Sequence, residues 1–122
     1  DPGSLVPANM IPAREGVTCM LRPEVIREAF YTDCDPATAD WACARLTPEP
    51  LKPLVTPLKL TPERFGHVPR VYIECTEDKA VTPFIQRKMY SETPCEKVYS
   101  LPTSHSPFFS RPNELVEILL SL

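Results

Sequence analysis

The sequence predicts an α/β fold, built in its last third from two parallel strands joined by a helix. Residues 70–75 and 96–101 are short runs of β-favouring, largely apolar residues. Residues 82–92 between them combine a helix start signal at Thr82-Pro83 with a helical apolar pattern. Because parallel strands need a crossover connection, both strands are expected to end at the same edge of one sheet.

The first 20 residues carry prolines and glycines among small apolar residues, which predicts an ordered but irregular connection. A short helix is expected over residues 23–31, where Pro23 occupies the first turn and needs no N–H partner. A second helix is expected over residues 36–46, with Asp35 as its N-cap. The two helices would form a hairpin with one apolar face, an arrangement typical of a cap over a sheet.

The segment 47–69 is dense in proline, which excludes a long helix or a central strand. Because leucines persist through it, we expect an extended segment that lies on apolar surface and leads from the cap back to the sheet.

The near-continuous apolar character of residues 70–75 predicts a strand buried on both faces. The helix after it is expected to turn Phe84, Ile85, Met89 and Tyr90 toward the sheet. A closing helix is expected from residues 110–112 onward, with an apolar stripe formed by Leu115, Val116, Leu119 and Leu120.

Length and composition exclude several classes of protein. The chain has 122 residues, the length of one domain, yet two strands are too few for a stable parallel sheet, so we expect part of a larger domain. A net charge of −3 with scattered Lys and Arg argues against nucleic-acid and membrane-surface roles. No signal peptide and no run near the ~20 apolar residues of a membrane span is present.

Cysteine and histidine usage gives no sign of a metal site. The five cysteines are irregularly spaced without a C-x-x-C pair, and the chain has two histidines. Reduced thiols are the simplest interpretation, and they favour a cytoplasmic location.

Polar side chains follow both predicted parallel strands. His105 lies in a Thr-Ser-His-Ser-Pro turn beyond the second strand, and Glu77 and Asp78 follow the first. An acid beside a histidine orients the ring and stabilises its protonated form, which is the supporting half of a nucleophilic triad. Position alone leaves Glu77 and Asp78 as alternatives. Glu74 lies too early in the strand, and His67 precedes the strand at its amino end.

A nucleophile is not evident in this chain. No Gly-x-Ser-x-Gly sequence is present, and Ser104 and Ser106 flank His105 too closely for proton transfer. Cys75 has no basic neighbour that would lower its pKa. We therefore expect the nucleophile to come from elsewhere.

Three stretches, residues 69–78, 86–89 and 104–112, together resemble the C-terminal part of the α/β-hydrolase superfamily. The nearest branch is the plant methylesterase and hydroxynitrile-lyase group, with its bacterial pyrethroid-hydrolase-like carboxylesterase relatives. In that group an Asp after the penultimate core strand lies eight residues before a Gln, as Asp78 lies before Gln86. The family His follows the last strand, as His105 does. The resemblance implies that Asp78 and His105 are catalytic.

The same resemblance implies that residues 1–66 form the cap segment with its Pro-rich return and that residues 67–122 form the C-terminal part of the hydrolase core. An N-terminal half outside this chain would supply the nucleophilic Ser and the oxyanion hole. By family position, Ser106 and Val81 would line the substrate pocket.

The implied activity is hydrolysis of a small hydrophobic carboxylic ester through a Ser-His-Asp triad, without metal or organic cofactor. The lyase branch carries Lys after its His, where this chain has Ser106. Two alternatives stay open: a hydroxynitrile-lyase-type cleavage, and a non-catalytic protein that binds a small ligand. The oligomeric state also stays open, a homodimer included.

Overall fold

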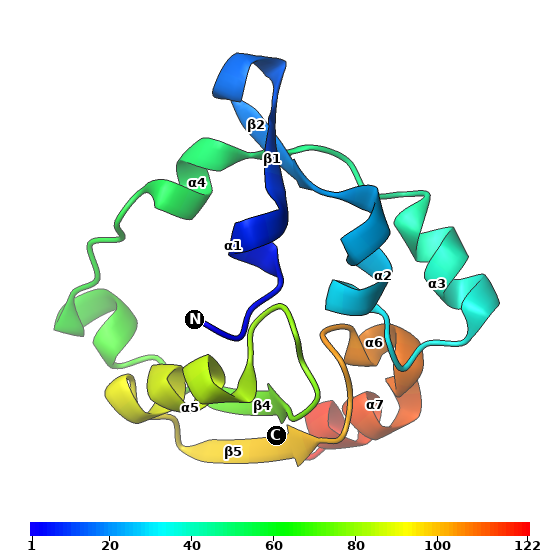
Figure 1. Ribbon diagram of the computed structural model, residues 1–122. Helices are drawn as coiled ribbons and strands as arrows, with labels where there is room; N and C mark the ends of the chain where they lie inside the picture. The colour runs from blue at the N-terminus through cyan, green and yellow to red at the C-terminus, as the bar shows by residue number, and fades with distance from the viewer.

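The computed structural model describes residues 1–122 and contains two separate sheets. The first is antiparallel, with strands β1 (Met10–Ala13), β2 (Thr18–Leu21) and β3 (Glu49–Pro50) in that order. The second is a parallel pair, β4 (Val71–Cys75) and β5 (Lys97–Leu101). The β1–β2 hairpin projects away from the β4–β5 pair, which lies at the opposite end of the molecule (Figure 1).

The predicted strand–helix–strand unit is confirmed. Helix α5 (Pro83–Glu92) joins β4 to β5, and the register pairs Val71 with Lys97 and Cys75 with Leu101. The pairing continues one step past the strands, because the N–H of Thr76 donates to the carbonyl of Leu101 at 2.9 Å. Both strands therefore end at one edge, and the loops that follow them are neighbours.

The prediction of an irregular connection over the first 20 residues is wrong. Helix α1 (Val6–Asn9) leads into the β1–β2 hairpin, whose turn is the 3-10 segment η1 (Arg14–Gly16). All three turn residues have positive φ, at 46°, 54° and 84°. Pro12 lies within β1, which is the edge strand of its sheet, where a missing N–H is tolerated. That proline hid the strand in the sequence pattern.

The two predicted cap helices are present as α2 (Pro23–Phe30) and α3 (Pro36–Cys43). The carboxylate of Asp35 accepts the N–H of Thr38 at 3.0 Å, as expected of an N-cap, and α3 ends at Cys43 rather than at residue 46. The main apolar core lies between this hairpin and β2, and its buried residues are Leu21, Ile26, Ala29, Tyr31, Ala39 and Ala42.

The Pro-rich segment holds only short elements, β3, α4 (Leu51–Val55) and the π-helical turn η2 (Pro62–Gly66), as its prolines require. The expectation that its leucines lie on apolar surface is wrong for two of them. Leu58 and Leu60 are 81% and 57% exposed.

The face of α5 that meets the sheet differs from the predicted one. Phe84 and Met89 are exposed, whereas the ring of Tyr90 packs 5.2 Å from that of Tyr72 on β4. The most buried residue of the helix is Gln86, which is 3% exposed. Strand β4 is also more open than predicted, because its first residue, Val71, is exposed in this chain.

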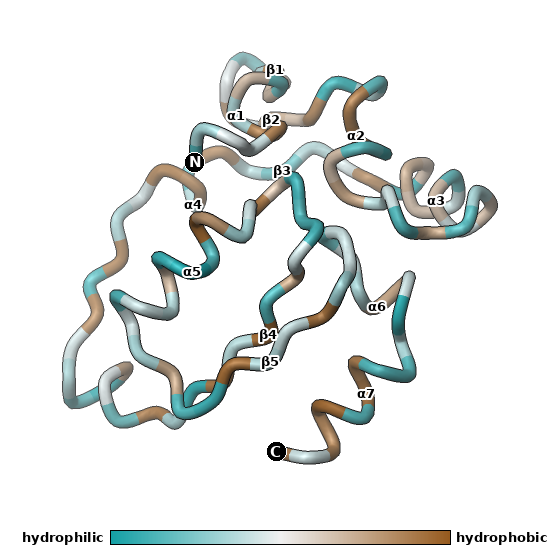
Figure 2. The backbone as a smooth tube through the Cα atoms, turned by 60° about the horizontal axis from the view of Figure 1, so that its bottom comes forward, coloured by the Kyte–Doolittle hydropathy of each residue, from teal (hydrophilic) through white to brown (hydrophobic).

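The closing helix forms as α7 (Pro112–Leu120), preceded by an unpredicted short helix, α6 (Pro107–Ser110). Its apolar stripe stays uncovered, since Val116, Leu119 and Leu120 are all exposed, and apolar and polar positions alternate along the helix in Figure 2. None of the helices combines the length and the hydropathy that a bilayer crossing requires.

Candidate active site

The loop after β4 is folded around the carboxylate of Asp78. Its Oδ1 accepts the N–H of Ala80 at 2.7 Å and the N–H of Val81 at 2.9 Å, and the residue is 6% exposed. These bonds fix the side-chain rotation because both donors belong to the same loop. The second oxygen, Oδ2, is left to face the turn that follows β5.

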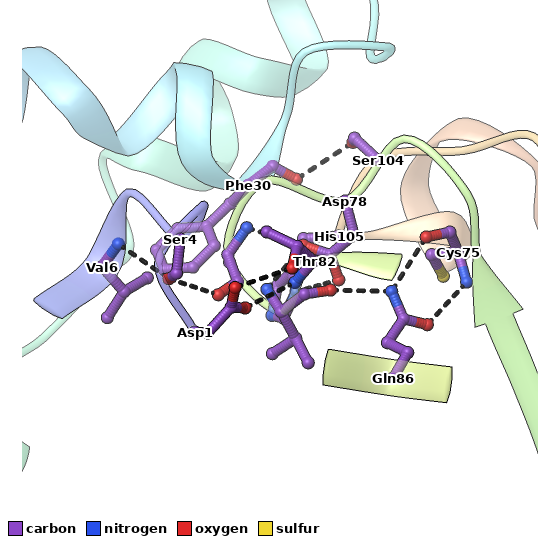
Figure 3. A network of polar contacts seen from close by, with 12 residues as sticks. Asp1, Ser4, Val6, Phe30, Cys75, Asp78, Thr82, Gln86, Ser104 and His105 are labelled. Atoms are coloured by element: carbon purple, nitrogen blue, oxygen red, sulfur yellow. Dashed lines mark hydrogen bonds and ion pairs between the residues drawn. The ribbon is translucent and has the colours of Figure 1, made fainter. Parts of the chain in front are cut away.

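His105 meets that oxygen. Its Nδ1 lies 2.9 Å from Asp78 Oδ2, although the two residues are 27 positions apart in the sequence (Figure 3). The His105 side chain is 36% exposed, whereas that of Asp78 is 5% exposed. With Nδ1–H donating to the carboxylate, Nε2 is the nitrogen available to exchange a proton with a reactant. The structure thus brings together the acid and the histidine that the sequence analysis singled out.

Gln86 holds both ends of the Asp78 loop from α5. Its Oε1 accepts the N–H of Cys75 at 2.9 Å, and its Nε2 donates to the carbonyls of Cys75 at 2.9 Å and Val81 at 2.7 Å (Figure 3). All three hydrogen bonds of the Gln86 amide are to backbone atoms, and together they connect the last residue of β4 to the end of the loop. Sequence spacing drew attention to Gln86 but did not indicate this function.

The N-terminal segment supports the same loop from another side. The N–H of Leu5 donates to the carbonyl of Lys79 at 2.9 Å, and Ser4 Oγ donates to the carbonyl of Ala80 at 2.6 Å. Neither contact carries a sequence signal, because both donate to main-chain atoms more than 70 residues away.

The turn that carries His105 is packed tightly on both sides of the imidazole. Thr103, Ser104 and Ser106 are at most 2% exposed. Ser104 Oγ contacts the carbonyl of Phe30 at 3.3 Å and the carboxylate of Asp33, and the rings of Phe30 and His105 lie 5.1 Å apart. Asp33 was not among the predicted site residues, since it reads as a polar residue in a helix connection.

A cavity of about 580 Å³ opens beside this pair. Most of its walls are apolar and come from α1, the β1–β2 hairpin, α2, α5 and the start of the Pro-rich segment, including Val6, Met10, Leu21, Ile26, Leu54, Ile85 and Met89. His105 and Val81 lie on its surface. Ser106 is buried and lies outside the lining, so the structure places the two predicted pocket residues differently.

The remaining candidates lie away from the pair. Glu77 is exposed, and Glu74 is buried at mid-strand, where it accepts Arg87 Nε at 2.7 Å and Ser100 Oγ at 3.1 Å. Burial raises the pKa of the Cys75 thiol, which opposes a role as nucleophile. All five cysteines are free, and no three His, Cys, Asp or Glu side chains are grouped to hold a metal ion.

Comparison with known proteins places these residues among hydrolases. A family model described as the alpha/beta hydrolase family matches residues 2–118. Putative methylesterase 14 of Arabidopsis thaliana, described as chloroplastic, is 38% identical over 82 residues, and methylesterase 18 of the same plant is 33% identical over 104 residues. The crystal structure of a pyrethroid hydrolase from Sphingobium faniae JZ-2 superposes with a TM-score of 0.78 at 30% identity.

The matches cover most of this chain but less than half of each relative. They span 66% of the chain and 24% of methylesterase 14, and 83% of the chain and 39% of methylesterase 18. For the pyrethroid hydrolase the shares are 98% and 48%. The chain therefore corresponds to at most about half the length of these proteins.

Proposed function

The chain belongs to the α/β-hydrolase family, and from that membership we propose that it supplies the Asp–His pair of a carboxylic ester hydrolase. The α/β fold class predicted from the sequence is confirmed, since the chain covers about half of α/β-hydrolase structures. The relatives are named as esterases and hydrolases.

The observation that carries the proposal is the Asp78–His105 contact, in which His105 also lines an apolar cavity. A serine from a segment outside this chain attacks the ester carbonyl while His105 Nε2 accepts the hydroxyl proton. His105 returns that proton to the leaving alcohol and then activates the water that cleaves the acyl-enzyme. Asp78 holds the imidazole in the tautomer that leaves Nε2 basic and stabilises the imidazolium that forms.

The cavity indicates a hydrophobic ester as the class of substrate. Its volume of about 580 Å³ is within the range of small-molecule sites, and its walls are mostly apolar. Because His105 lies on this wall, an ester bound here would present its carbonyl to the imidazole while its apolar groups leave water.

We propose that the polypeptide carrying the nucleophile packs against the β4–β5 pair and α7. Val71 and Val98 are exposed on opposite faces of the pair, because Val71 pairs with Lys97 and Val98 pairs with Tyr72. Leu119 and Leu120 are exposed on α7. A parallel pair of strands is stable only when both its faces are covered, and the other strands and helices of an α/β-hydrolase core would cover these residues.

Two measurements test the ester-hydrolase proposal. A denaturing intact-mass spectrum of the protein as purified identifies any second polypeptide and its Gly-x-Ser-x-Gly sequence. That assembly is then assayed for hydrolysis of p-nitrophenyl esters, with His105→Ala as the test variant and His67→Ala as the control, since His67 is exposed, precedes the amino end of β4 and does not line the cavity. Loss of turnover in His105→Ala alone supports the proposal, and equal turnover in both variants contradicts it. The 122-residue chain by itself is expected to be inactive.

A second candidate, binding of a small hydrophobic ligand without catalysis, is favoured by one observation. The mostly apolar cavity is formed by residues of this chain alone, which includes no evident nucleophile. Equilibrium binding of an aryl ester distinguishes the candidates. A binding protein keeps its affinity in His105→Ala and shows no acylated serine by mass spectrometry.

A further inference from the structure

The α2–α3 connection reaches the turn that carries His105. Ser104, immediately before the histidine, is 1% exposed and directs its hydroxyl at this connection. There Oγ contacts the carboxylate of Asp33 and the carbonyl of Phe30, which lie 71 and 74 residues away in the sequence. A buried hydroxyl needs such partners, and an ionised carboxylate is the stronger of the two acceptors.

The Asp33 carboxyl is held in its charged form. Partial burial raises its pKa, but hydrogen bonds from Ser104, from Ser110 and from the backbone together outweigh burial and keep the pKa below its usual value. Ser110 Oγ and Asp33 Oδ2 are both buried, and neither atom has a partner within hydrogen-bond geometry, so the Ser104 hydroxyl is the side-chain contact of this carboxylate. At neutral pH, Ser104 therefore faces a negatively charged acceptor.

The other side of the turn is anchored to the same region. Phe109 on α6 packs 6.0 Å from the ring of Tyr31 and 5.8 Å from that of Trp41, at the ends of the cap hairpin. The ring of Phe30 lies 5.1 Å from the imidazole itself. The histidine turn thus lies between a polar anchor at residue 104 and an apolar anchor at residue 109, both supplied by the cap.

We propose that Asp33 is a positioning residue for the Asp78–His105 pair and acts through the hydroxyl of Ser104. The carboxylate holds the start of the histidine turn against the end of α2, which keeps Nδ1 within hydrogen-bond distance of Asp78. The placement of the imidazole is thereby linked to the cap that walls the cavity. This inference deepens the ester-hydrolase proposal and rests on it for its catalytic consequence.

The first test observes the imidazole directly. In the protein as purified, with this chain labelled with ¹⁵N, the Nδ1–H proton of His105 is expected far downfield, because it is hydrogen-bonded to a carboxylate. Asp33→Ala and Ser104→Ala are expected to shift or broaden this signal, whereas Asp40→Ala, which removes an exposed carboxylate from the same hairpin, leaves it unchanged. An unchanged signal in both test variants overturns the proposal, whether or not the protein is an esterase.

The second test asks whether Asp33 acts through Ser104. In the assembly that hydrolyses esters, Asp33→Ala is expected to lower kcat about tenfold with KM changed by less than about twofold, since misplacement of a catalytic group costs rate rather than ground-state binding. Introduced into Ser104→Ala, the same change is expected to have no further effect. Additive losses in the double variant contradict action through Ser104.

Asp33→Asn keeps the test decisive if the alanine variants fail to fold. It preserves the shape and one acceptor oxygen while removing the charge, and it is expected to show a smaller shift of the His105 signal in the same direction. The assignment is overturned if Asp33→Asn has the thermal midpoint, the His105 signal and the kcat of the wild type.

Discussion

Replacing Gln86 by Leu tests whether one buried amide maintains the geometry of the candidate active site. Leucine has similar volume but removes all three hydrogen bonds to the ends of the Asp78 loop. The carbonyl of Cys75 keeps a second donor, the N–H of Asp78 at 3.4 Å, so the variant leaves two groups unpaired, the N–H of Cys75 and the carbonyl of Val81. At about 1–3 kcal/mol for each of the two unpaired groups, the free energy of unfolding is expected to fall by about 2–6 kcal/mol.

The assay combines urea unfolding with amide hydrogen exchange. The Cys75 N–H, protected in the wild type by Gln86 Oε1, is expected to lose its protection in Gln86→Leu well before global unfolding. Lys88→Leu is the matched control, because Lys88 lies two residues along the same helix in an exposed 3.8 Å pair with Glu92, and its change is expected to stay below about 0.5 kcal/mol. If Gln86→Leu is no less stable than Lys88→Leu and the Cys75 amide stays protected, the reasoning is refuted.

Three further outcomes are expected. Asp78→Asn is expected to lower the kcat of the ester-hydrolysing assembly about 10⁴-fold, because it stabilises the wrong tautomer of His105. The control, Glu77→Gln, changes an exposed neighbour and is expected to leave kcat within about twofold. Equal losses in the two variants would contradict the assignment. The Cys75 thiol, buried and with a raised pKa, reacts with a disulfide reagent at pH 8 only after unfolding; rapid modification of native protein would disprove this. Because folding lowers the pKa of Asp33, its ionised carboxylate contributes to stability above pH 3.8, and this contribution is lost as the pH falls further. The difference in unfolding free energy between wild type and Asp33→Ala is therefore expected to narrow in acid. A difference that stays constant with pH would contradict this expectation.

Local chemistry explains which parts of the fold could be predicted. The caps and prolines at Asp35-Pro36 and Thr82-Pro83 act within one turn of chain, and the helices begin where these residues predict. The β1–β2 hairpin was missed because Pro12 breaks the usual strand pattern, and its tolerance depends on β1 being an edge strand. An edge position is a property of the assembled sheet and leaves no local signal.

For this protein, the sequence by itself determined the strand–helix–strand unit, the hydrolase resemblance and the order of Asp78 before His105. The first follows from apolar periodicity, and the other two rest on the residues of three short stretches and on their order in the chain. Only the tertiary structure brought the Asp78 carboxylate to His105, placed Gln86 across the loop ends and brought Asp33 to Ser104. The reason is that each of these choices is a hydrogen bond between groups 11 to 71 residues apart, and such a partner is set by packing in three dimensions rather than by neighbouring residues.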